Sequence, residues 1–150
     1  MKEIPIKKYV RYVFGIAILV FILNKLLIRP WLSGNDVSDS FLIVSYSIPN
    51  LIEATIGTLL ITGILLQIRQ YFNSRFGSVK DTYIHILSVC IASIYVISQE
   101  LKFHNLGGNN VYDPYDIGAS LIGLLATFGI IQLFGFTEKK MDEYKIQDRQ

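Results

Sequence analysis

Four carboxylic acids and one amide stand out as candidate binding residues. Glu53 lies in the middle of the long apolar segment 41–67, and Asn50 precedes it by three residues. An ionisable residue inside a membrane is expensive and is by default a candidate functional residue. Glu100, Asp113 and Asp116 follow in the second half of the chain. A carboxylate can bind a cation, and Glu53 is the candidate general base if the protein is an enzyme.

Each of these residues also has a purely structural interpretation. Asp113 before Pro114 is a good helix N-cap, with Asp116 on the positive end of the helix dipole. Glu100 at a helix end can simply face water. A protonated Glu53 can be held by a hydrogen bond to Asn50 or Thr55. The sequence leaves these alternatives open.

A metal site, if the chain has one, is expected to bind a hard cation. Carboxylate and carbonyl oxygens suit calcium or magnesium, and Glu100, Asp113 and Asp116 are the candidate ligands. Zinc would be expected to recruit histidine or cysteine, and His104 alone does not make a zinc site. Cys90, the only cysteine, has no partner for a disulfide, and we predict that it packs inside a helix bundle.

The composition predicts a membrane protein. Of 150 residues, 51% are hydrophobic and only 17% are charged, which argues against an ordinary soluble domain. Apolar blocks long enough to cross a bilayer occupy about 12–28, 41–67, 83–101 and 117–136. None alternates with period two, so the prediction is an all-α, single-domain bundle of four transmembrane helices. We expect Pro30 to end the first helix.

The distribution of basic residues predicts which side of the membrane each loop occupies. The two terminal segments and the loop between the second and third helices hold 11 of the 14 Lys and Arg residues. By the positive-inside rule both termini are cytoplasmic. The chain lacks a basic face for nucleic acid. Glu53, Asn50, Glu100, Asp113 and Asp116 then belong to the outward-facing half of the protein.

The segment 98–129 resembles the VanZ-like family of bacterial membrane proteins. Glu100 closes one helix, and Asp113, Asp116, Ser120 and Gly123 lead into a last helix rich in small residues. The sequence departs from the family where Ser120 replaces an expected Asn and where Gly107-Gly108 lacks an expected Arg. The resemblance implies a multi-pass protein of the bacterial inner membrane, linked in some members to glycopeptide antibiotic resistance. It implies no particular reaction.

Three hypotheses follow for the function. The first is an outward-facing acidic pocket, with Glu53 as its deep anchor, that recognises or modifies a cell-envelope precursor or lipid-linked group. The second is an oligomeric channel or membrane effector with Glu53 lining the pore and small residues of 117–136 at a homo-oligomer contact. The third is an accessory subunit that docks a protein partner through the charged segment 138–150. Whether the protein is an enzyme stays open.

Overall fold

The computed structural model describes residues 4–35, 37–72, 76–100 and 113–138, with only the backbone described at Glu100. These residues are helical, and they contain no strand beyond one isolated bridge pair. The elements are α1 (Lys8–Leu23), the π-helix η1 (Asn24–Ile28), α2 (Arg29–Ser33), α3 (Asp39–Tyr71), α5 (Asp81–Glu100) and α6 (Pro114–Phe134).

Four helical spans in the described part of the chain are long and apolar enough to cross a membrane. They are Lys8–Ser33, Asp39–Tyr71, Asp81–Gln99 and Pro114–Phe134. This confirms the predicted all-α class and the prediction of four helices long and apolar enough to cross a membrane. It supports a multi-pass membrane protein, whereas the orientation in the membrane stays a prediction.

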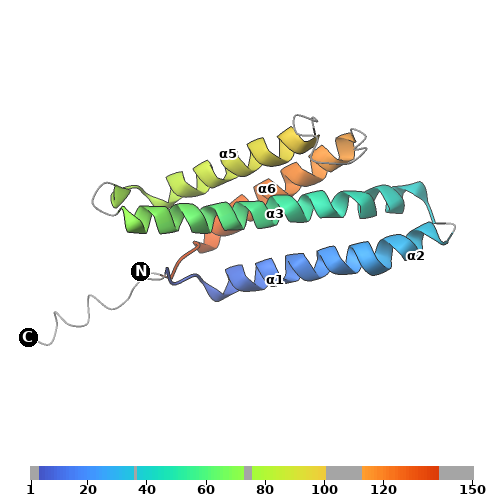
Figure 1. Cartoon of the computed structure of the whole chain (residues 1–150), viewed down its shortest axis with the longest axis horizontal. Helices are drawn as coiled ribbons and strands as arrows, with labels where there is room; N and C mark the ends of the chain where they lie inside the picture. The colour runs from blue at the N-terminus through green and yellow to red at the C-terminus, as the bar shows by residue number, and fades with distance from the viewer. Residues whose placement is uncertain (1–3, 36, 73–75, 101–112, 139–150) are drawn as a thin grey trace, which may run out of the picture.

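Helix α3 is the centre of the arrangement (Figure 1), with α5 and α6 on one side and α1 on the other. Its most extensive contact is with α6. One buried cluster joins α3, α5 and α6 through Ala54, Ala92, Val96 and Leu124. A second cluster adds α1 and the segment after α6, and it includes Val10, Leu59, Leu66 and Phe136. The bundle is therefore held mainly through α3.

The two described chain ends lie side by side. Ile6 pairs with Thr137 in an antiparallel bridge, the Lys7 N–H donates to the Phe136 carbonyl (3.1 Å), and the Glu138 N–H donates to the Pro5 carbonyl (2.8 Å). The Tyr9 hydroxyl adds a hydrogen bond to the Gly135 carbonyl (2.7 Å). The two described chain ends therefore lie at the same end of the bundle.

The predicted end of the first helix at Pro30 is wrong. The helix continues through η1 and α2 to Ser33. In η1 the Arg29 N–H bonds the Asn24 carbonyl, five residues back, so the regular helical pairing has already shifted when the chain reaches Pro30. Pro30 then falls in the first turn of α2, where a missing N–H is tolerated.

The predicted packing role of Cys90 is also wrong, because Cys90 is exposed on α5. In an apolar helix of a membrane protein both faces look alike in sequence, so the outward face was not distinguishable from the inward one.

Candidate functional site

Glu53 is half-buried in the middle of α3, beside the Tyr95 side chain of α5. The Gln99 amide, one turn along α5, donates to the Tyr95 hydroxyl oxygen at 2.7 Å. Because that oxygen already accepts a hydrogen bond, the phenolic hydrogen is left for the Glu53 carboxylate. Glu53, Tyr95 and Gln99 thus form a polar row across two apolar helices.

This polar row is open to the surface of the bundle. Tyr95 is 48% exposed. In the described part of the chain the one ion pair joins Arg69 to Asp81 (2.6 Å), and it involves neither Tyr95 nor Glu53. The described residues therefore offer Glu53 a neutral hydrogen-bond donor and no cation. A cationic group arriving from outside would find a carboxylate without a competing partner.

The structure records no hydrogen bond that holds Glu53 to Thr55 or Asn50 among the described residues. The Thr55 hydroxyl donates to the Leu51 carbonyl at 3.0 Å, so it does not hold Glu53. Asn50 is half-buried one turn before Glu53, and the structure records no hydrogen bond between their side chains.

Gly123 of α6 fixes the register between α3 and α6. A Cβ atom added there would lie 2.4 Å from the Leu51 carbonyl oxygen and 3.1 Å from the Ala54 side chain. Only glycine permits this approach, because any side chain would overlap the backbone of α3. Since both helices run in the same direction (Figure 1), residues before Gly123 lie beside residues before Leu51.

Asp116 and Ser47 lie in the part of this interface toward the starts of α6 and α3. Asp116 lies seven residues before Gly123, and Ser47 lies four before Leu51, so helical periodicity places both on the contact faces. The Asp116 Oδ1 and Ser47 Oγ atoms are buried and have no hydrogen-bond partner among the described residues. Buried polar atoms of this kind require a partner, which a ligand or an ordered water can supply.

The predicted carboxylates therefore lie at two different positions along the helix axes. From the register, Asp116 is about 13 Å from Glu53 along the helix axes, at about 1.5 Å per residue. Asp113 serves as the N-cap of α6, and its Oδ1 accepts the Tyr115 N–H at 2.9 Å. The predicted cap is confirmed. The Glu100 side chain lies outside the described residues.

Two polar residues that the sequence analysis did not single out bind the α3 backbone one turn before Pro49. Pro49 has no N–H for the Ser45 carbonyl. The Asn24 amide donates to that carbonyl at 2.8 Å and the Arg29 Nε at 3.3 Å, while the Ser45 hydroxyl donates to Asn24 at 2.9 Å. The carbonyl freed by Pro49 is therefore used within the protein. An asparagine inside an apolar block was the available signal for it.

A second buried polar pair joins α5 to α6. His85 is buried, and its Nδ1 lies 2.9 Å from the Gln132 amide oxygen. The other ring nitrogen, Nε2, is buried without a described partner. Asp81, four residues before His85 on the same helix, pairs with Arg69 and not with His85. This pair therefore joins helices and is separate from the Glu53 row.

Among the described residues, no three His, Cys, Asp or Glu side chains gather as a metal site. The predicted calcium or magnesium ligands Glu100, Asp113 and Asp116 stay a prediction, because the Glu100 side chain and residues 101–112 lie outside the described part of the chain.

Comparison of the chain with protein-family models, curated proteins and solved structures finds no match.

Proposed function

We propose that the end of the bundle with Glu100, Asp113 and Asp116 binds a cationic group, with Glu53 as the deep anchor. The observation that supports this is a half-buried carboxylate in an apolar helix whose described neighbour is the neutral Tyr95 hydroxyl. A charge in hydrocarbon persists only with a partner or a function. An incoming cation would supply the missing charge, and Tyr95 would orient the carboxylate.

Two further buried polar atoms, on the side of Glu53 toward the starts of α3 and α6, extend the site. Asp116 brings a buried oxygen without a described partner about 13 Å along the axes from Glu53, and Ser47 brings another about 9 Å from Glu53. One polar headgroup that spans this distance, or a calcium or magnesium ion bridging to one, would reach both Glu53 and Asp116. Glu100 and Asp113 are placed at the entrance of this site.

The ligand class that we propose is a lipid-linked precursor of the cell envelope. A site that opens to the side of a membrane-spanning bundle is accessible to a lipid-borne group from the bilayer itself. The basic-residue distribution supports an outward-facing orientation of this end, and the VanZ-like resemblance implies the bacterial inner membrane. The resemblance of 98–129 to VanZ-like proteins adds an envelope role. We propose binding as the activity, and Glu53 as the candidate base if the ligand is also modified.

Mass spectrometry of the lipids and ions retained by the purified protein tests the proposal. Wild type should retain a cationic or metal-bridged ligand, and Glu53→Gln should lose it because the amide keeps the shape and removes the charge. Asp39→Asn is the matched control, since Asp39 is exposed in the first turn of the same helix. Equal retention by wild type and Glu53→Gln would overturn the proposal.

The channel hypothesis is distinguished by a second measurement. Cation flux through liposomes that contain the protein, abolished by Glu53→Gln, would indicate a pore in place of a binding pocket. The close packing of Gly123 against α3 supports the pocket, because it commits part of the small-residue face of α6 to contacts within one chain.

A further inference from the structure

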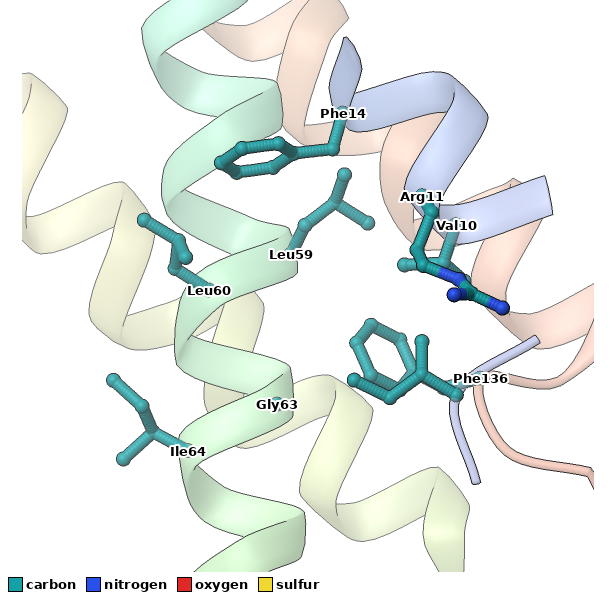
Figure 2. A pocket seen from close by; sticks show the side chains of 9 residues that line it. Val10, Arg11, Phe14, Leu59, Leu60, Gly63, Ile64 and Phe136 are labelled. Atoms are coloured by element: carbon teal, nitrogen blue, oxygen red, sulfur yellow. The ribbon is translucent and has the colours of Figure 1, made fainter. Parts of the chain in front are cut away.

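A groove of about 410 Å³ lies between α1 and α3, at the end of the bundle where the two chain ends meet. Figure 2 shows Phe14 and Val10 on one wall and Leu59 and Leu60 along α3. The remaining lining residues are Ile6, Arg11, Gly63, Ile64 and Phe136. Apart from Arg11 the lining is apolar, and the size is that of a small-molecule site.

Hydrogen bonds hold the first helical span, Lys8–Ser33, to the rest of the bundle near both of its ends. At one end the bridge between Ile6 and Thr137 and the Tyr9 hydroxyl hold the start of α1. At the other end Asn24 and Arg29 bind the backbone of α3. The groove lies at the first of these ends, where Gly63 of α3 faces the Phe136 ring and has no side chain to fill the space.

The position of the groove points to an acyl chain as its occupant. The groove lies along two spans that are apolar enough to cross a membrane, so its natural surroundings are lipid tails. Arg11, in the first turn of α1, sits at the terminal end, and Phe14 lies one turn deeper. The groove therefore runs from the membrane surface inward, as a lipid tail does.

Charge selects the class of lipid. Arg11 and Lys8 are both exposed, and neither forms an ion pair with a described residue. Basic side chains beside a groove between membrane helices bind the phosphate of anionic lipids. We infer that the groove binds one acyl chain of an anionic phospholipid whose phosphate is held by Arg11, with Lys8 adding positive charge. This site is separate from the Glu53 row, because the groove is lined by residues 59–64 of α3, farther along the helix toward the described chain ends.

The inference is tested by native mass spectrometry of the delipidated full chain in detergent, titrated with phosphatidylglycerol or phosphatidylcholine of identical acyl chains. Wild type should bind one phosphatidylglycerol more tightly than phosphatidylcholine. Arg11→Gln should weaken phosphatidylglycerol about fivefold and leave phosphatidylcholine unchanged, since one basic residue is lost near the lipid phosphate. Arg11 is exposed, so this variant should fold as wild type does.

Two glycine variants test the groove itself. Gly63→Leu should abolish binding of both lipids, because an added Cβ would lie 3.7 Å from the Phe136 ring and the leucine would fill the groove. Gly57→Leu is the matched control on the same helix, where an added Cβ meets no atom within 4 Å, and it should bind like wild type.

Circular dichroism and thermal melting of each variant establish that it is folded. Equal affinity of wild type for the two lipids, or undiminished binding by folded Gly63→Leu, would overturn the inference. A dimer of wild type that Gly63→Leu dissociates would also overturn it, because a second copy of the chain would then occupy the groove.

Discussion

Glu53 differs from Asp81 and Asp113 in its surroundings. Asp81 pairs with Arg69, and Asp113 caps α6. Glu53 meets only a neutral hydroxyl. A carboxylate that stabilised the fold would be expected to have a cation or backbone N–H groups as partners, and Glu53 has neither among the described residues. The free-energy cost of keeping the Glu53 carboxylate without such a partner is the physical sign of a binding residue.

This difference predicts opposite effects of two substitutions on stability. Glu53→Gln should leave the free energy of unfolding in detergent unchanged or raise it by about 1 kcal/mol, because it removes an unpaired charge. Asp81→Asn should lower it by up to about 1 kcal/mol, since it breaks a largely exposed ion pair. Chemical denaturation at neutral pH measures both. A loss of more than about 2 kcal/mol for Glu53→Gln would show a structural charge pair instead.

At the scale of elements, Pro49 inside α3 is coupled to the attachment of the first helical span to α3. Pro49 removes the N–H that would bond the Ser45 carbonyl. Asn24 of η1 replaces that donor from another helix, and the Arg29 guanidinium stacks over Tyr46 at 4.7 Å while donating to the Tyr46 carbonyl. A defect in one helix thereby becomes a contact between two.

A double-mutant cycle tests this coupling. Asn24→Leu should destabilise the protein by about 1–3 kcal/mol, because Ser45 loses a donor to its carbonyl and an acceptor for its buried hydroxyl. In a Pro49→Ala background the loss should be about 1 kcal/mol smaller, since replacing the proline restores an N–H to that carbonyl. Denaturant unfolding in detergent measures the free energy of unfolding of the wild type, the two single variants and the double variant.

The control for this cycle is Gly129→Ala on α6, where the added methyl group meets no atom within 4 Å. Its effect should add to that of Asn24→Leu, because the two sites share no contact. The same loss for Asn24→Leu in the Pro49→Ala and wild-type backgrounds would show that Pro49 and Asn24 act independently.

These contacts mark the boundary of what the sequence could predict. Helix class and number follow from apolar blocks of sufficient length, and the α6 start follows from Asp113-Pro114, because both signals are local. The contact of Glu53 with Tyr95 depends on the rotation of α3 and α5 about their axes, which uniformly apolar helices do not encode in a polar face. The π-helix after Leu23 likewise arises from a tertiary contact of Asn24, so the predicted stop at Pro30 was wrong.

For the whole molecule, two proposed sites lie at different positions along α3, and the orientation of the protein decides which side of the membrane each one faces. The Glu53 row lies toward the end where α3 begins, and the groove beside Arg11 lies toward the end where the chain termini meet. A bilayer presents different groups at its two faces, so the orientation decides which site meets an envelope precursor and which meets cytoplasmic-leaflet lipid. The positive-inside rule assigns the Glu53 end to the outside.

Two serines at opposite ends of α3 test that orientation. Ser38 precedes α3 and Ser78 follows it, and both are exposed. In a Cys90→Ser background, a membrane-impermeant maleimide added to intact cells should label Ser38→Cys and not Ser78→Cys, and inverted membrane vesicles should give the reverse. Labelling of Ser78→Cys alone in intact cells would turn Glu53 toward the cytoplasm and exclude an outer-leaflet ligand. Labelling of both from one side would mean that α3 does not cross the membrane, although its 33 residues extend about 50 Å and exceed the hydrocarbon thickness of about 30 Å.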